Sequence, residues 1–455
     1  MFEAATNVID ITPVAPPFPS LWMGGYGWGP RANSGAVARP LLANCLVLWD
    51  NGVPNVLVRA DLVGIDREIH QRIRDAVVVE GVASSDFLLA VSHTHSGPQM
   101  SNRRLDPYVL MGLRQVDVLA VEGTVDRIAA ALVDLVRETL TLPRVPVTLH
   151  YSESCAMIGF NRVGESDVLT DVPILALRRE DDSPYAVLFG AAAHPVARGN
   201  DAVFDSDYCG AAVDRVERLL DCRAMFFIGC CGDQEPVGGR SDEVVVDHGR
   251  TVADAVVNRM QDPASFVEVT GPIVTARTEV DLPLSVDLTD PAVRAALRAK
   301  YESRRDTLPP GEQNRRHAEV MLRMIDDGTV PTALPMPIQR WRFGGLTILG
   351  LAHEVLSWYD TRLRESFDGR LWVMGCVGEV ESYVPHDRVL WAGGARHLGY
   401  EAGWAGDNTI AGFNTYTVPY AWPAPLKASP VGVEPAVPGS AEHELLRACL
   451  DLLGP

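Results

Sequence analysis

Residues 91–98 read Val-Ser-His-Thr-His-Ser-Gly-Pro, and an apolar run that begins at residue 87 ends at the first of them. Such a run is typical of a buried strand, and the Gly-Pro pair predicts a turn after it. Side chains at positions i and i+2 of a strand point to the same side, so we expect His93 and His95 to converge at the mouth of a sheet. Two converging imidazoles can hold a metal ion. A hydrogen-bonded histidine pair at a strand end is the alternative, and the His-x-His spacing alone does not separate the two.

The composition is that of a folded, soluble enzyme. The chain has 455 residues, of which 47% are hydrophobic and 22% charged, and this excludes a disordered protein or a coiled coil. Its net charge of −19 excludes a nucleic-acid backbone or an anionic membrane as partner, because both would repel it. The sequence lacks a secretion signal at its start and any run of roughly 18 apolar residues that would predict a membrane span. We therefore expect a cytoplasmic protein.

Eight cysteines are scattered along the chain without the Cys-x-x-Cys spacing of a thiolate zinc site. We expect most of them to be buried thiols. Cys230 and Cys231 are adjacent and follow an apolar run at residues 224–228. A redox or nucleophilic role is open for this pair, although the apolar context favours their use as small buried residues.

The order of the predicted elements indicates an α+β or mixed α/β fold. Hairpins are expected at residues 44–61 and 174–189, where turn residues separate apolar runs. Because strands and helices are interleaved, we expect mixed sheets flanked by helices. The helical periodicity covers residues 66–79, 116–140, 210–220 and 242–260, and further strands are expected at 338–341 and 346–351.

The segment 290–330 differs from the rest of the chain in its charge. Its helical pattern is broken at Leu308-Pro309-Pro310-Gly311, and its charged residues do not suit a core position. We predict a helical insertion or lid there.

Two more polar residues follow predicted strands, as His93 does. His194 follows an apolar run, and Glu354 follows another at the expected first turn of a helix over residues 354–365. Open sheets place active sites at the ends of strands. Two imidazoles and a carboxylate are a ligand set of zinc hydrolases, in which one position stays open for water. The alternative for Glu354 is a carboxylate that the helix dipole favours.

In these motifs and their order, the sequence resembles the catalytic domain of the neutral ceramidases, zinc amidases that hydrolyse an N-acyl bond. Six matches follow one another between about residues 8 and 400, which chance would not produce. The resemblance implies a neutral-ceramidase-like fold and a single catalytic domain over residues 1–455. The matches are His93-Thr94-His95-Ser96-Gly97-Pro98, Phe160-Asn161-Arg162, Ala193-His194-Pro195, Ser206-Asp207, Gly232-Asp233 with Pro236, and Glu354 with Arg362-Leu363-Arg364-Glu365.

Carried over residue by residue, the resemblance implies that His93, His194 and Glu354 bind zinc. It places His95 behind these ligands, as the group that donates to the oxyanion or to the leaving group. An unperturbed imidazole titrates in the range that such a proton transfer needs.

The resemblance also assigns roles to four residues outside the metal ligands. Arg162 would anchor a polar or anionic substrate group, with a surface ion pair to a carboxylate such as Asp167 as the alternative. Tyr383 would face the substrate or pack with its hydroxyl group satisfied. We expect Asp233 to support catalysis by bracing a loop or a histidine. Glu235 stands where the family has a serine, and it can act as a base.

One metal ligand of the family is missing from this sequence. The tyrosine ligand of the ceramidases falls on Val380, so we expect a more open metal site or a ligand from Glu379 or Glu381. Too few residues follow the last motif for the immunoglobulin-like C-terminal domain of the family. A divergent bacterial-type member without that domain, and without a lipid-facing substrate, is therefore expected.

These observations predict a zinc-dependent hydrolase of carbon–nitrogen bonds in linear amides. The expected enzyme is an N-deacylase that uses metal-activated water on a small-molecule amide. The sequence leaves open whether the protein forms homo-oligomers. A zinc esterase or lactonase is the close alternative, because the same hydroxide attacks either carbonyl. A catalytically silent binding protein that keeps the fold is the second alternative, which the changed tyrosine and serine positions favour.

Overall fold

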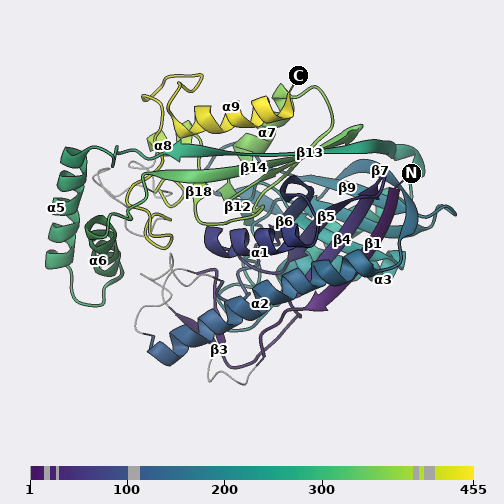
Figure 1. The fold of residues 1–455 in the computed structure, drawn as a ribbon, viewed down its shortest axis with the longest axis horizontal. Helices are drawn as coiled ribbons and strands as arrows, with labels where there is room; N and C mark the ends of the chain where they lie inside the picture. The colour runs from purple at the N-terminus through teal and green to yellow at the C-terminus, as the bar shows by residue number, and fades with distance from the viewer. Residues whose placement is uncertain are drawn as a thin grey trace.

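A mixed sheet of twelve strands forms the centre of the protein (Figure 1). The computed structural model describes residues 2–14, 21–26, 30–100, 113–392, 399–403 and 416–454. The strands of the sheet are β1 (Phe2–Asp10), β4 (Leu42–Asp50), β5 (Val53–Ala60), β6 (Phe87–Val91), β7 (Val145–Cys155), β9 (Asp171–Arg178), β10 (Pro184–Ala191), β11 (Arg223–Ile228), β13 (Val267–Pro283), β14 (Ala333–Gly344), β15 (Leu346–Leu351) and β17 (Leu371–Met374).

The main path of the sheet has the order β17-β15-β14-β13-β7-β1-β4-β5-β6, and β9, β10 and β11 branch from β7. Three neighbouring pairs are parallel, namely β5–β6, β10–β11 and β15–β17. Smaller two-stranded sheets join β2 (Leu21–Met23) to β3 (Arg31–Asn33), β8 (Gly159–Asn161) to β12 (Gln234–Pro236), and β16 (Glu354–Val355) to β18 (Tyr383–Val384).

Helices cover the sheet on its outer sides (Figure 1). Within the described residues, no helix combines the length and the apolar character that crossing a bilayer requires. The helices are α1 (Arg67–Val79), α2 (Gln115–Thr141), α3 (Asp207–Leu220), α4 (Asp242–Met260), α5 (Pro291–Thr307), α6 (Gln313–Asp326), α7 (Ser357–Ser366), α8 (Asp387–Ala392) and α9 (Ala441–Leu453).

The prediction of mixed sheets flanked by helices is confirmed. Both expected hairpins form, β4 with β5 and β9 with β10. The first turns through Asn51 and Gly52, which have φ values of 50° and 83°. Positive φ at both central residues matches the right-handed twist of the flanking strands, and asparagine and glycine tolerate it best.

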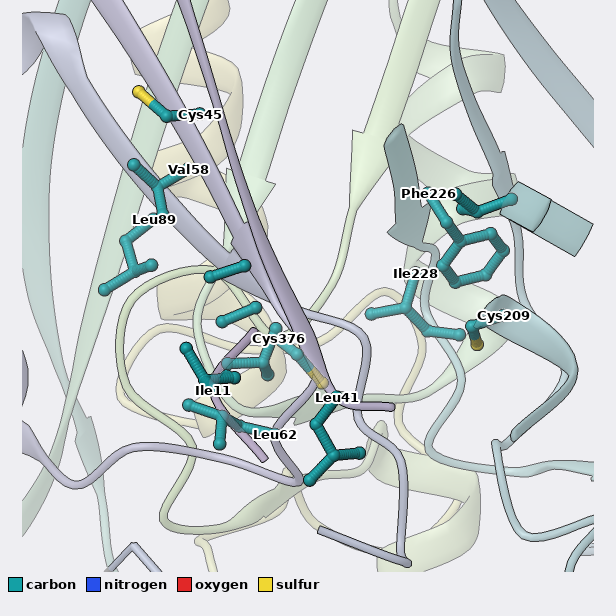
Figure 2. Packing of buried hydrophobic residues seen from close by; sticks show 14 of the residues in the cluster. Ile11, Leu41, Cys45, Val58, Leu62, Leu89, Cys209, Phe226, Ile228 and Cys376 are labelled. Atoms are coloured by element: carbon teal, nitrogen blue, oxygen red, sulfur yellow. The ribbon is translucent and has the colours of Figure 1, made fainter. Parts of the chain in front are cut away.

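Alternation along the strands sorts the apolar side chains into separate clusters. On β4, Cys45 and Val47 pack toward α1 to α4, in the cluster that Figure 2 shows, whereas Leu46 and Leu48 face the opposite way. There they share a cluster with Trp372 of β17, at the other end of the main strand path. The two halves of the sheet therefore pack face to face, and a third cluster joins the β13–β15 region to the C-terminal helices.

The predicted helical insertion consists of α5 and α6, which lie between β13 and β14 and project from one end of the molecule (Figure 1). The Tyr301 hydroxyl of α5 donates to the carbonyl of Pro423 at 2.6 Å, and Nε2 of His317 on α6 lies 3.1 Å from the carbonyl oxygen of Trp422. The two helices therefore hold the segment 416–426 in place. Their action as a lid remains a prediction.

A buried carboxyl group on α9 makes stability depend on pH. Glu442 accepts a hydrogen bond from the Asp387 backbone N–H at 2.7 Å, and burial raises its pKa from 4.5 to about 7. The unfolded chain releases the Glu442 proton above pH 4.5, whereas the folded chain releases it only near pH 7. The contribution of Glu442 to the free energy of unfolding therefore falls between these two pH values as pH rises. We expect Glu442→Gln to raise Tm at pH 8 by on the order of 2 °C and to leave Tm at pH 4 unchanged.

Glu444, on the same helix, provides the matched control for differential scanning fluorimetry. It pairs with Arg447 at 2.7 Å, and its pKa is lowered chiefly by that hydrogen bond. A carboxylate whose pKa is lowered in the folded protein stabilises the fold at pH values above its pKa in the unfolded chain. This stabilisation is lost as pH falls. Glu444→Gln should therefore lower Tm at pH 8. If each variant changed Tm by the same amount at pH 4 as at pH 8, the prediction would be contradicted.

Candidate metal centre

Three imidazoles meet beyond the carboxyl ends of two strands. His93 and His95 follow β6, and His194 follows β10. The Nε2 atom of His194 lies 3.1 Å from that of His93 and 2.9 Å from that of His95, and the Nε2 atoms of His93 and His95 are 3.4 Å apart. The convergence predicted from the sequence is therefore present in the fold.

The backbone at His93 differs from the extended strand that the spacing suggested. Strand β6 ends at Val91, and His93 has a φ of 65°, in the left-handed region. Its backbone N–H donates to the carbonyl of Leu62 at 2.9 Å, which holds the turn. The expectation of a strand through both histidines is thus wrong, because tertiary hydrogen bonding bends the chain first. Left-handed residues other than glycine are uncommon and are found at constrained sites.

Two of the three histidines are oriented from behind. Nδ1 of His93 lies 2.5 Å from the carbonyl oxygen of Val63, and Nδ1 of His194 lies 3.0 Å from that of Cys231. A carbonyl accepts only, so each Nδ1 carries a proton and each Nε2 faces the centre of the cluster. Nδ1 of His95 is buried without a hydrogen-bond partner among the described residues. His95 is therefore the histidine that no carbonyl orients.

Glu354 completes the cluster, although its local structure is not the predicted one. It lies in β16, which pairs in parallel with β18, and α7 begins only at Ser357. The prediction of a first-turn helical position is wrong, because the Glu354 backbone N–H donates to the carbonyl of Ser382 at 2.9 Å. Oε2 of Glu354 lies 3.2 Å from Nε2 of His93 and 3.7 Å from Nε2 of His194.

This donor set fits a zinc ion. Ligand atoms at 2.0–2.1 Å from zinc in a tetrahedron are about 3.3 Å apart, close to the separations among His93, His194 and Glu354. Oε2 of Glu354 is buried and accepts no hydrogen bond from the described residues, which is costly for a carboxylate unless a cation binds it.

The charges around the cluster also suit a cation. Burial lowers the pKa of His93, but Glu354 outweighs this effect and the pKa rises to about 9. The pKa values of His95 and His194 lie well below the ordinary value, first because of burial and then because of neighbouring imidazoles. His95 and His194 are therefore neutral, which is the form of imidazole that binds a metal, whereas His93 binds one by exchanging its Nε2 proton for the ion.

Arg162 lies in a partly buried ion-pair network. Its Nε donates to Glu401 at 2.6 Å, its Nη1 to Glu235 at 3.0 Å, and its Nη2 to the Tyr383 hydroxyl at 3.3 Å and to the carbonyl of Gly232 at 2.9 Å. The alternative of a surface pair with a carboxylate such as Asp167 does not describe this site. The guanidinium is instead bound to two carboxylates and a tyrosine, and sequence reasoning missed Glu401.

Glu235 is held between two arginines. Besides Arg162, it accepts a hydrogen bond from Arg240 at 2.7 Å. Burial alone would raise its pKa, but the two guanidinium groups lower it. A carboxylate stabilised in this way is a weak base, so the geometry does not favour the base role expected from the sequence.

Asp233 braces the loops beneath the cluster. Its carboxylate accepts hydrogen bonds from the Ser357 backbone N–H at 2.9 Å, the Ser357 hydroxyl at 2.8 Å and the Asn161 side chain at 2.7 Å. The carbonyl of the next residue, Gln234, accepts from the His194 backbone N–H at 2.7 Å. Asp233 therefore acts on the histidine through the loop and does not itself contact the imidazole cluster.

The position of the missing tyrosine is apolar. Val380 is buried in the core. The structure places neither neighbouring carboxylate at the histidines: Glu379 accepts from the Arg67 guanidinium at 2.7 Å, and Glu381 accepts from the Arg67 backbone N–H at 3.1 Å. The suggestion that one of them replaces the tyrosine is not supported by these contacts.

A tyrosine from another part of the chain contacts the cluster. The Tyr420 hydroxyl donates to Oε1 of Glu354 at 2.5 Å, across 66 positions of sequence. Tyr420 lies in the segment that α5 and α6 hold, and its surroundings in the sequence carry no motif that would predict this contact. Burial raises the pKa of Glu354, but His93 first, and then Tyr383 and Tyr420, outweigh this effect and lower it, so Tyr383 also acts on this carboxylate.

The fold of the chain is similar to that of two solved ceramidase structures. The structure of the neutral ceramidase from Pseudomonas aeruginosa is similar, with a TM-score of 0.68 and 16% sequence identity over 92% of this chain and 72% of that one. The chain has a neutral-ceramidase-like fold. A structure described as ceramidase complexed with C2 matches with a TM-score of 0.69 and 17% identity, over 92% and 73% of the two chains. No family model matches the sequence, and no curated protein sequence matches it.

Proposed function

We propose that this neutral-ceramidase-like protein is a zinc-dependent amide hydrolase that acts on a small, soluble N-acyl compound. The observation that carries the proposal is the buried donor set of His93, His194 and Glu354, in which one carboxylate oxygen has no hydrogen-bond partner among the described residues. Two imidazoles and a carboxylate are the ligands of zinc hydrolases with an open coordination position. The similarity to ceramidase structures favours an amide as the bond that is cleaved.

The residues around the donor set have separate roles in the proposed reaction. A zinc ion bound there would supply an activated water and polarise the scissile carbonyl group. His95 has an Nε2 atom within 3.4 Å of both other imidazoles but no carbonyl behind its Nδ1. Burial and the neighbouring imidazoles lower the pKa of His95, so its protonated ring is a strong acid. We therefore assign it the donation of a proton to the departing amine.

Arg162 and Tyr383 act on the substrate side of this proposal. Because Arg162 already donates to Glu401, Glu235 and Tyr383, its role is to hold the Tyr383 hydroxyl in one orientation. Tyr383, which lies at Glu354, is the better candidate to contact a bound substrate.

Metal analysis and a matched substrate panel test the proposal. Protein dialysed against zinc should retain about one ion per chain by plasma mass spectrometry, and it should hydrolyse N-acyl amides. Each amide is assayed beside the ester of the same acyl group, which separates an amidase from an esterase or lactonase. Metal-replete protein that cleaves no amide in a broad panel would refute the proposal. Protein that binds no metal would favour a silent binding protein.

Tyr420 is expected to tune the metal site. Tyr420→Phe removes the hydrogen bond to Oε1 of Glu354 and preserves the ring. Partners behind a ligating carboxylate contribute to affinity, so we expect metal binding to weaken by about 10-fold with little change in Tm. Competition with a chelator measures the affinity. Tyr185→Phe, which removes a hydroxyl that contacts the carbonyl of Ala4, is the control and should bind metal normally. Unchanged affinity in Tyr420→Phe would contradict the assignment.

A further inference from the structure

Two thiols lie close to His93. Cys231 follows β11 and Cys376 follows β17, and both are free and buried. One ring nitrogen of His93 and the two sulfur atoms all lie within 4.8 Å of one another. Of the free cysteines, these two alone belong to a group of potential metal ligands within the described residues. Their position is therefore not explained by burial alone, since other cysteines are equally buried.

The fold holds both thiols in place. Cys376 has a φ of 51°, a left-handed conformation that disfavours a side chain. It is stabilised by a hydrogen bond from its N–H to the carbonyl of His353 at 3.2 Å and by one from the Val91 N–H to its own carbonyl at 3.3 Å. Figure 2 shows Cys376 in the apolar cluster that surrounds it. The carbonyl of Cys231 is fixed by Nδ1 of His194.

We propose that His93, Cys231 and Cys376 form a second metal site, selective for thiophilic ions, which shares His93 with the histidine cluster. Thiolates with one imidazole select soft ions, whereas imidazoles with a carboxylate suit zinc. Each thiol releases its proton to solvent as its sulfur binds the ion. His93 and both thiols are buried, and His95 on the same cluster is partly exposed.

Sharing of His93 has a regulatory consequence. An imidazole nitrogen binds one ion at a time, so a thiophilic ion at the cysteines withdraws that ligand from the histidine cluster. Cadmium would then displace zinc and inhibit hydrolysis. This inhibition rests on the proposed function, whereas the binding of cadmium to the thiols does not.

Titration of the metal-free protein with Cd²⁺ tests the site. Cadmium–thiolate bonds absorb in the ultraviolet, and we expect this absorbance to saturate at about one ion per chain. It should disappear in both Cys231→Ser and Cys376→Ser. It should persist in Glu354→Gln, which removes the carboxylate of the histidine cluster and leaves His93 and both thiols in place. Cadmium binding to the thiols can therefore be tested even if the protein hydrolyses no amide. Equally, an absence of cadmium binding would leave the proposed amide hydrolysis untouched.

Two other cysteines provide matched controls. Cys155 is exposed, and Cys209 is buried in the same apolar cluster with its sulfur 3.8 Å from the carbonyl of Ser92. Cys155→Ser and Cys209→Ser should keep the absorbance. Loss of the cadmium–thiolate absorbance in Cys155→Ser would overturn the proposal, and so would its persistence in Cys231→Ser and Cys376→Ser. If the core variants do not fold, ¹¹³Cd NMR of the unaltered protein decides the question, because the chemical shift distinguishes two sulfur ligands from none.

Discussion

Replacing His194 by alanine should abolish both metal binding and amide hydrolysis. The variant loses one of the Nε2 donors and leaves Oε2 of Glu354 buried opposite an empty volume. We expect zinc to be removed by dialysis against a weak chelator and hydrolysis to fall by about 10³-fold or more, because the open ligand position works only while the metal is held. Plasma mass spectrometry and initial rates at saturating substrate measure the two effects.

His150→Ala is the matched control for this experiment. His150 is partly exposed on β7, and its Nε2 contacts the Thr148 hydroxyl at 2.9 Å. We expect this variant to keep its zinc and its activity. Normal zinc content in His194→Ala would remove His194 from the ligand set, and loss of zinc in both variants would point to a general loss of folding.

The sequence correctly predicts that His93, His194 and Glu354, each of which follows a strand, lie close together. Apolar runs end directly before the His-x-His pair, before His194 and before Glu354, and parallel strands bring such ends to one edge. That rule places residues together without stating how the backbone turns. The left-handed φ of His93 and the strand at Glu354 depend on hydrogen bonds to Leu62 and Ser382, which no local pattern encodes.

The parts of the site that the sequence does not predict are tertiary contacts from distant segments. Tyr420 reaches Glu354 only because α5 and α6 hold its segment, and Glu401 pairs with Arg162 across 239 positions. A single sequence carries no periodicity or spacing for such pairs. The same limit explains Glu379 and Glu381: they are neighbours of the missing ligand in sequence, but their backbone directs both toward Arg67.

Replacing Asp233 by alanine should destabilise the fold more than it changes the chemistry. The carboxylate is fully buried and accepts hydrogen bonds from Ser357 at the start of α7 and from Asn161 on β8. The substitution leaves the Ser357 backbone N–H unpaired, whereas the Ser357 hydroxyl and the Asn161 amide keep the Asp167 carbonyl as acceptor. A buried donor that loses a charged acceptor costs about 1–3 kcal/mol. We expect a Tm lower by several degrees and a loss of zinc as the loop that holds His194 loosens.

Asp233→Asn separates bracing from a direct catalytic role. Asparagine preserves the shape and one acceptor oxygen, so a bracing residue should lose only part of its stabilisation, with kcat and Tm falling together. A residue that touched the reacting atoms would lose kcat while Tm stayed constant. Asp167→Ala is the matched control, because Asp167 contributes its backbone carbonyl to Asn161, Gln234 and Ser357, and the substitution preserves that carbonyl. If Asp167→Ala lowers Tm as much as Asp233→Ala, the Asp233 carboxylate is not the brace, and the loop is held by its backbone.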